Sequence, residues 1–234
     1  MRFLLGVDEA GRGPLAGPVS VGVVAVPEGF DVLKEFPGVA DSKKLSEKKR
    51  EKIFEMLTTR ASAGDVCFAV EFESAETIDR EGIAVAVRRA LARGVNTLAP
   101  DAALVKIQLD GASAPLETSR LGTTGTNPGA SLTGQARPID SVHILLDGSL
   151  RAPPQYSQET IINGDELIPI VSLASIAAKV VRDRLMVGLS AEYPQYGFEK
   201  HKGYGTRAHY EMLEKHGLCV IHRRSFIHLD SKGK

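Results

Sequence analysis

Four acidic residues stand at or near the ends of short apolar runs, where a folded sheet can gather side chains for chemistry. Asp8 and Glu9 follow one run, Asp147 follows another, and Asp165 stands further along the chain. Carboxylates that converge in a dry site repel one another unless they share protons or bind divalent cations. Oxygen-only ligands favour magnesium or manganese over zinc. The pattern therefore predicts a hydrolytic site in which two such ions activate water and stabilise a leaving oxygen.

The same acidic residues leave alternatives open. An acidic residue at the end of a strand is more often a turn or capping residue than a ligand. Asp110 also follows an apolar stretch and precedes a glycine, so it competes with Asp147 for the third position. Adjacent Asp8 and Glu9 would point to opposite faces of a regular strand, so both can bind one cation only if the backbone bends there. The glycines that follow favour such a bend.

Two further segments could contact a phosphate backbone. Gly11-Arg12-Gly13 could form a tight turn whose backbone N–H groups approach a ligand closely. Ser175, Lys179 and Arg182 are spaced i, i+4 and i+7 and place a basic stripe on one side of a predicted helix. Such a stripe suits sequence-independent duplex binding, and it equally suits an ordinary solvated helix face.

The elements that would position these residues alternate between strands and helices. Strands are expected over Phe3 to Val7, Val19 to Val26, Val66 to Phe72 and His143 to Leu146. Helices are expected after Ser46, from Ser74 or Ala75 to a stop at Gly94, over Val171 to Leu189 and over Arg207 to His216. Asp147 would then end a strand, which is where open α/β sheets hold their sites. The pattern predicts one main α/β domain.

Composition excludes several classes of protein. The 29 Lys and Arg balance 29 Asp and Glu, so any surface for nucleic acid must be local. Cys67 and Cys219 are isolated, which argues against a zinc knuckle or a disulfide scaffold and favours a reducing compartment. No apolar run approaches the roughly 20 residues that span a bilayer, so we expect a cytoplasmic protein with no membrane partner.

Residues 112–138 are dense in Gly, Ser, Thr, Pro and Ala and predict an exposed insertion.

Segments in the order of one family cover nearly the whole chain outside that insertion. They read GVDEAGRGPLAGPV at Gly6 to Val19, DSKKLSEKKRE at Asp41 to Glu51, LLDGSL at Leu145 to Leu150, IINGDE at Ile161 to Glu166, SLASIAAKVVRDRLM at Ser172 to Met186, YPQYGFEKHKGYGT at Tyr193 to Thr206 and HRRSF at His222 to Phe226. Together they resemble bacterial ribonuclease HII. The related HIII type fits less well, because it lacks the Gly-Arg-Gly sequence after its acidic pair.

The resemblance implies an RNase H-like fold, in which helices flank a mixed β-sheet and a small helical part follows at the C-terminus. It implies a catalytic domain over residues 1–192 and a substrate-binding segment over residues 193–234. The family's metal-binding carboxylates fall on Asp8, Glu9, Asp147 and Asp165, which would hold two magnesium or manganese ions. The run that follows Asp147 continues as in the family, whereas the run after Asp110 does not, so the resemblance favours Asp147.

The resemblance also assigns the residues that would contact substrate. The turn that reads the 2'-hydroxyl beside the cut falls on Gly11, Arg12 and Gly13, and the junction-sensing tyrosine falls on Tyr204. Phosphate contacts fall on Lys43, Ser175, Lys179 and Arg182.

The implied activity is that of an endoribonuclease. Its substrates would be the RNA strand of RNA/DNA hybrids and ribonucleotides embedded in duplex DNA, cut on the 5' side to leave 5'-phosphate and 3'-hydroxyl ends. We expect a monomer. Two other classes stay open: a different two-metal nuclease of the same fold superfamily, which would cut all-DNA substrates, and a duplex-binding module without turnover.

Overall fold

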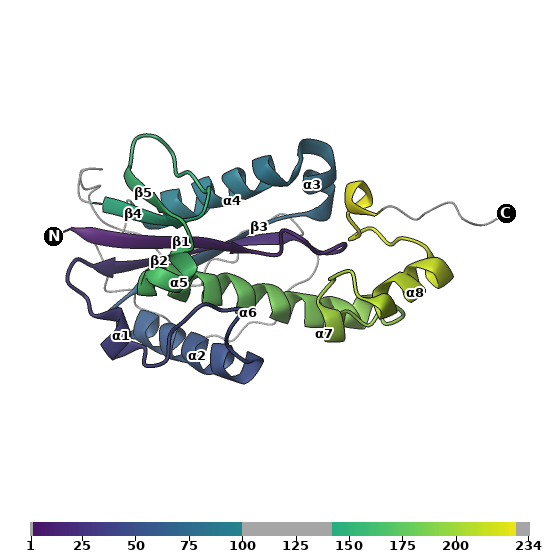
Figure 1. Cartoon of the computed structure of the whole chain (residues 1–234), viewed down its shortest axis with the longest axis horizontal. Helices are drawn as coiled ribbons and strands as arrows, with labels where there is room; N and C mark the ends of the chain where they lie inside the picture. Colours follow the sequence, from purple (N-terminus) through teal and green to yellow (C-terminus); the bar gives the residue numbers. More distant parts are fainter. Residues whose placement is uncertain (1, 100–141, 228–234) are drawn as a thin grey trace.

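The computed structural model describes residues 2–99 and 142–227, so Asp110 and the predicted insertion lie outside the described residues. The strands are β1 (Phe3–Ala10), β2 (Val19–Pro27), β3 (Cys67–Glu73), β4 (Val142–Asp147) and β5 (Ser157–Ile161). The helices are α1 (Val32–Glu35), α2 (Glu47–Ala63), α3 (Ala75–Glu81), α4 (Ile83–Leu98), α5 (Gly164–Leu167), α6 (Pro169–Glu192), α7 (Phe198–His201) and α8 (Arg207–His216), followed by a short 3-10 helix, Arg224–Phe226. Helices cover both faces of the sheet (Figure 1), which confirms the predicted α/β class.

The five strands form one mixed sheet in the order β3-β2-β1-β4-β5. β1 pairs antiparallel with β2 and parallel with β4, while β2 pairs antiparallel with β3 and β4 pairs parallel with β5. β1 is therefore the central strand, and β4 runs beside it in the same direction. The carboxyl ends of these two strands meet at one edge of the sheet, as the predicted position of the acidic residues requires.

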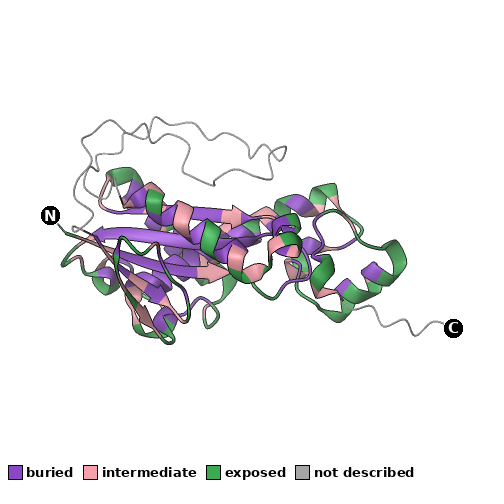
Figure 2. Ribbon diagram, turned by 90° about the horizontal axis from the view of Figure 1, so that it is seen from above, coloured by how far each residue is buried: buried purple, intermediate pink, exposed green. Residues whose placement is uncertain are grey.

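Each face of the sheet is covered by its own apolar core. Leu5 and Val7 of β1 pack with residues of α4 on one face, and residues of α2 and α6 form the core of the other face. Figure 2 shows the central strands buried and the outer surfaces of the helices exposed. Leu5 and Val7 lie on the same face because every second side chain of an extended strand points to the same side of the sheet.

Two glycines let α6 lie directly on the central strands. A Cβ atom at Gly6 would lie 2.4 Å from the carbonyl oxygen of Ile170, and one at Gly22 would lie 2.2 Å from that of Ala174. Any side chain at either position would therefore push the helix away from the sheet. The close approach brings the polar residues of α6 beside the end of β1.

The helix expected from Ser74 or Ala75 to Gly94 is two helices, so that prediction was wrong in its extent. Gly82, at φ +84°, ends α3, and α4 continues to Leu98. Gly94 does not end a helix, since α4 runs through it. A Cβ atom at Gly94 would lie 2.8 Å from Cγ2 of Val23. Its small size lets α4 pack closely on β2. The strand β5 was not predicted.

Residues 193–227, which we term the C-terminal lobe, follow α6 and pack on its second half. A third apolar cluster joins this lobe to the turn after β1 and contains Leu15, Ala16, Met186, Leu189, Tyr196, Phe198, Leu213 and Ile221. The division of the chain at residue 192 into two functional domains stays a prediction. Over residues 2–99 and 142–227, no helix has the length and apolarity to cross a membrane.

Candidate active site

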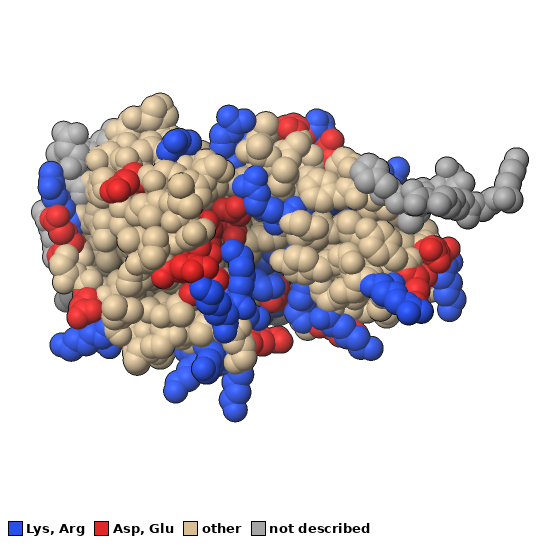
Figure 3. All heavy atoms as spheres, in the orientation of Figure 1, with Lys and Arg blue, Asp and Glu red and all other residues tan. Residues whose placement is uncertain are grey.

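Three of the four predicted carboxylates meet at the edge of the sheet. Parallel pairing of Val7 with Leu146 places the next residues of the two strands, Asp8 and Asp147, side by side. Asp165 joins them from α5, and each of the three offers a carboxylate oxygen within 4.8 Å of the others. On the face of the molecule seen in Figure 3, acidic side chains gather near the middle and basic side chains border them.

The loop after β5 turns back to bring Asp165 to this place. Asn163 adopts a left-handed conformation at φ 56°, and α5 begins directly after it. The backbone N–H of Asp165 points at Oδ1 of Asp147 across 3.4 Å, and Ser172 donates a hydrogen bond of 2.7 Å to the carbonyl oxygen of Asp165. α5 is thereby held between β4 and the start of α6.

Glu9 lies outside the three-carboxylate group, and the bend expected after Asp8 is absent. β1 pairs regularly with β2 through Ala10, so Asp8 and Glu9 take opposite faces of the strand. Glu9 Oε1 accepts a hydrogen bond of 3.1 Å from Arg12, while its buried Oε2 has no hydrogen-bond partner among the described residues. An unsatisfied buried carboxylate oxygen is costly unless a donor or a cation approaches it.

The charge of this site suits a divalent cation. Burial, and next the charge of Glu9, raise the pKa of Asp8 well above its usual range. Asp147 adds to the same repulsion. The ligand atoms are all carboxylate oxygens, which is the ligand set that magnesium and manganese prefer. The residues present therefore fit such an ion, with Glu9 Oε2 as a further oxygen close by.

Polar side chains of α6 and of the loop before α2 surround the carboxylates. Lys43 Nζ donates to Asp165 Oδ2 at 3.0 Å, and this bond raises the pKa of the lysine. The Ser175 hydroxyl lies close enough to Asp8 to favour its charged form, and it is 2.8 Å from the hydroxyl of Ser42. Ser42 is a site residue that our sequence reasoning missed, although its place next to Lys43 is a usable signal.

Lys179 and Tyr204 lie together at the junction of α6 with the C-terminal lobe. Lys179 Nζ is 2.8 Å from Oδ1 of Asp183 and 5.4 Å from the centre of the Tyr204 ring. Tyr204 is 39% exposed, so part of the residue is accessible to a ligand.

Arg182 is not the exposed phosphate contact that the basic stripe predicted. It is fully buried, and its guanidinium donates to the carbonyl oxygens of Pro18, Ala16 and Lys202. A side chain without exposed atoms cannot reach a phosphate, so the stripe of α6 faces inward at this position. The helical spacing correctly placed Arg182 on the side of α6 that carries Lys179, but the C-terminal lobe covers this side at Arg182.

The Gly11-Arg12-Gly13 turn directly follows β1 and lies beside the carboxylates. Gly11 has φ +90°, and a Cβ atom there would lie 2.2 Å from Nε of Arg182. Apart from its two chain neighbours, no described residue has an atom within 4 Å of the place where a Cβ of Gly13 would stand, so the described part of the chain leaves the turn open on that side. Buried Arg223 donates to the carbonyl oxygens of Gly11 and Arg12.

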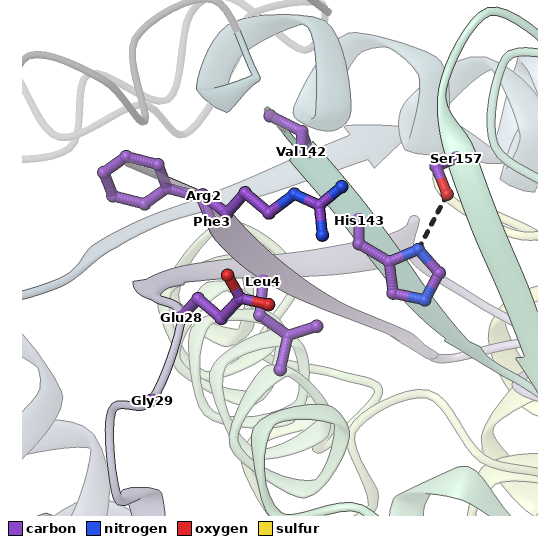
Figure 4. Close-up of a pocket in the computed structure, with 8 residues that line it drawn as sticks. All are labelled: Arg2, Phe3, Leu4, Glu28, Gly29, Val142, His143 and Ser157. Atoms are coloured by element: carbon purple, nitrogen blue, oxygen red, sulfur yellow. Dashed lines mark hydrogen bonds between the residues drawn. The ribbon is translucent and has the colours of Figure 1, made fainter. Parts of the chain in front are cut away.

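A separate pocket of about 420 Å³ lies at the beginning of β1, away from the carboxylates (Figure 4). Its lining includes Arg2, Glu28 and His143, and His143 is hydrogen-bonded to Ser157 at 2.9 Å. It contains one acidic side chain, Glu28, and no converging set of ligands. Among the described residues, the converging carboxylates lie at the opposite end of β1.

Comparison with known proteins gives one consistent family. The family model described as ribonuclease HII matches residues 5–126 and 132–229. The chain is similar to a ribonuclease HII of Coxiella burnetii, with 38% identity covering 96% of this chain and 88% of the relative, and to one of Endomicrobium trichonymphae, with 39% identity covering 94% and 83%.

Solved structures show the same fold. Ribonuclease H2 from Pyrococcus horikoshii matches with a TM-score of 0.62 and 23% identity, covering 95% of this chain and 93% of that one. The structure of Bst-RNase HIII in complex with Mn²⁺ matches with a TM-score of 0.56 and 18% identity, covering 92% of this chain and 63% of that one. The mixed sheet with flanking helices implied by the resemblance is thus confirmed. The chain belongs to the ribonuclease HII family and is a metal-dependent ribonuclease.

Proposed function

We propose that this chain cuts the RNA strand of RNA/DNA hybrids and also the 5' side of ribonucleotides embedded in duplex DNA, leaving 5'-phosphate and 3'-hydroxyl ends. Endoribonuclease activity on RNA/DNA hybrids is the activity of its family. The observation that carries the proposal is the convergence of Asp8, Asp147 and Asp165 within 4.8 Å at the edge of the sheet. A phosphodiester placed there would lie beside the Gly11-Arg12-Gly13 turn.

Asp8, Asp147 and Asp165 would hold two magnesium or manganese ions, and Glu9 would offer its Oε2, unpaired among the described residues, to one of them. Bound there, such ions supply the charge neutralisation and the water activation that phosphodiester hydrolysis needs. Burial and the charge of Glu9 disfavour the charged form of Asp8, and a bound cation would offset that cost by favouring the carboxylate. The Mn²⁺ complex of the structurally similar Bst-RNase HIII is consistent with this choice of metals.

The remaining side chains would bind and orient the duplex. Lys43, which contacts Asp165, and Lys179, which lies beside Tyr204, would contact phosphates on either side of the cut. The backbone N–H groups of the turn would meet the 2'-hydroxyl, the group that distinguishes RNA from DNA. Tyr204 would stack against the next sugar and tolerate deoxyribose there. Ser175 would hold Asp8 in place and would touch no phosphate.

The test compares three duplexes in the presence of magnesium: an RNA/DNA hybrid, a DNA duplex with one ribonucleotide, and the same duplex made only of DNA. We expect the first two to be cut, with the ends named above, and the third to stay intact. Asp147→Asn should abolish cutting, while Asp110→Asn, the matched control, should retain it.

Two results would contradict the proposal. Cleavage of the all-DNA duplex would point to another nuclease of the same fold. Tight duplex binding without cleavage, in magnesium and in manganese, would point to a binding module.

A further inference from the structure

Two buried arginines hold the turn after β1 by its carbonyl oxygens. Arg223 donates to Gly17 at 2.9 Å, to Arg12 at 2.9 Å and to Gly11 at 2.7 Å. Arg182 donates to Pro18 at 2.8 Å and to Ala16 at 3.2 Å. Both side chains are 0% exposed. Five of the eight residues from 11 to 18 are thereby fixed through their backbone.

These two charges lack the partners that buried arginines usually have. Among the described residues, Arg223 has no ion pair, and Arg182 has only Asp183 at 4.0 Å. Burying a charge is costly unless it is paired or fully hydrogen-bonded. Burial, and next the charge of Arg182, lower the pKa of Arg223 to about 9, so it stays charged at neutral pH. Carbonyl dipoles of one short turn compensate both charges, which ties the conformation of the turn to the two guanidinium groups.

The direction of these carbonyl groups sets the direction of the N–H groups. The described chain has no cis peptide, and in a trans peptide the N–H points opposite to the C=O. The carbonyls of Gly11 and Arg12 point inward to Arg223, so the N–H groups of Arg12 and Gly13 point outward. Neither N–H donates to any acceptor within residues 2–99 and 142–227. The turn that carries these donors is joined to the site by the hydrogen bond from the Arg12 side chain to Glu9.

The same anchor reaches the segment that carries Tyr204. Arg182 also donates to the carbonyl oxygen of Lys202 at 3.1 Å, and Leu15 N–H donates to that of Gly203 at 2.8 Å. Gly203 can have no side chain, because a Cβ atom would lie 2.3 Å from the carbonyl oxygen of Ala16. The turn and the tyrosine are therefore held in one frame.

We infer that Arg182 and Arg223 are positioning residues for ribose selectivity: they aim the N–H groups of Arg12 and Gly13 at the 2'-hydroxyl of the nucleotide beside the cut. The inference rests on the proposed function, in which this turn reads the ribose. It adds that selectivity depends on two arginines that touch neither the substrate nor the metal.

The test measures ribose selectivity in binding, separately from cleavage. Calcium replaces magnesium so that the duplex stays intact, and affinity is measured for a DNA duplex with one ribonucleotide and for the same duplex without it. Arg223→Lys keeps the charge but loses the planar fork of donors. We expect its preference for the ribonucleotide to fall about five- to tenfold, the effect of one or two lost hydrogen bonds. Its affinity for the all-DNA duplex should stay unchanged.

Arg224→Lys is the matched control, because Arg224 is the next residue and is exposed. It should keep the full preference, and circular dichroism should show both variants folded at the assay temperature. If Arg223→Lys is folded and keeps the full preference of the wild type, the inference is overturned. If the wild type itself shows no preference, the proposed role of the turn fails first, which separates the two failures.

A second measurement needs no variant. The amide resonances of Arg12 and Gly13 are followed by NMR in the wild-type protein with each duplex in calcium. We expect both amides to shift with the ribonucleotide duplex and to shift less with the all-DNA duplex. Equal shifts with the two duplexes would overturn the inference, even if Arg223→Lys does not fold.

Discussion

A relay of hydrogen bonds in the C-terminal lobe makes the stability of the protein sensitive to acid. His209 Nδ1 lies 2.9 Å from the carbonyl oxygen of Tyr204, so it must carry the proton. His209 Nε2 then accepts from Nε2 of His222 at 3.1 Å, and Nδ1 of His222 accepts from Cys219 N–H at 2.9 Å. Both rings are neutral, and every ring nitrogen has a partner. A further proton on either ring would break a bond in the relay.

The size of the effect follows from the pKa of His222. Burial, and next the electrostatic effect of the neighbouring His209, lower it from 6.5 to about 4. Between these two values the unfolded chain binds a proton that the folded chain does not, so stability falls as the pH falls from 6.5 towards 4. The difference corresponds to on the order of 3 kcal/mol of unfolding free energy. Well above pH 6.5, His222 makes no pH-dependent contribution to the unfolding free energy.

The assay is urea unfolding at several pH values between 7 and 4, followed by circular dichroism. His222→Gln should be less stable than the wild type at pH 7, because it loses packing and part of the relay. On acidification, its unfolding free energy should then fall by on the order of 3 kcal/mol less than that of the wild type. His216→Gln, at an exposed position of the same lobe, should follow the wild type. Parallel pH profiles for the wild type and His222→Gln would refute the reasoning.

Three shorter predictions test the surroundings of the site. Gly203→Ala should destabilise the fold by more than about 2 kcal/mol in urea unfolding, because φ is +86° and the new Cβ would meet the carbonyl oxygen of Ala16; unchanged stability would contradict the described turn. Asp8→Asn should raise the thermal midpoint in the absence of divalent cations and abolish cleavage, since it removes a buried charge next to Glu9; an unchanged or lower midpoint would contradict the repulsion. Lys43→Ala should reduce the slope of log affinity against log salt for duplex DNA by about one, and an unchanged slope would remove Lys43 from the phosphate contacts.

Local patterns were enough to predict the elements that build the site. The apolar run before Asp8 and the run before Asp147 are β1 and β4, and the helix expected over residues 171–189 lies within α6. Because parallel strands end at one edge of a sheet, the approach of these two carboxylates follows from the strand assignment. Residues at the ends of strands were therefore predictable from the sequence.

What the sequence could not predict depends on contacts between distant segments. Arg182 has the spacing of an exposed helix stripe, yet the C-terminal lobe covers it, and no local pattern reports that cover. Gly94 resembles a helix stop, although its role is to let α4 approach Val23 on β2. The expected bend at Glu9 was wrong because pairing with β2 keeps the strand regular as far as Ala10.

The most direct measurement is a diffraction experiment on crystals of the protein grown with manganese, with anomalous scattering used to locate the ions. We expect manganese bound by carboxylate oxygens of Asp8, Asp147 and Asp165 at the common end of β1 and β4. Manganese bound only elsewhere, or bound at this edge without Asp147, would contradict this expectation.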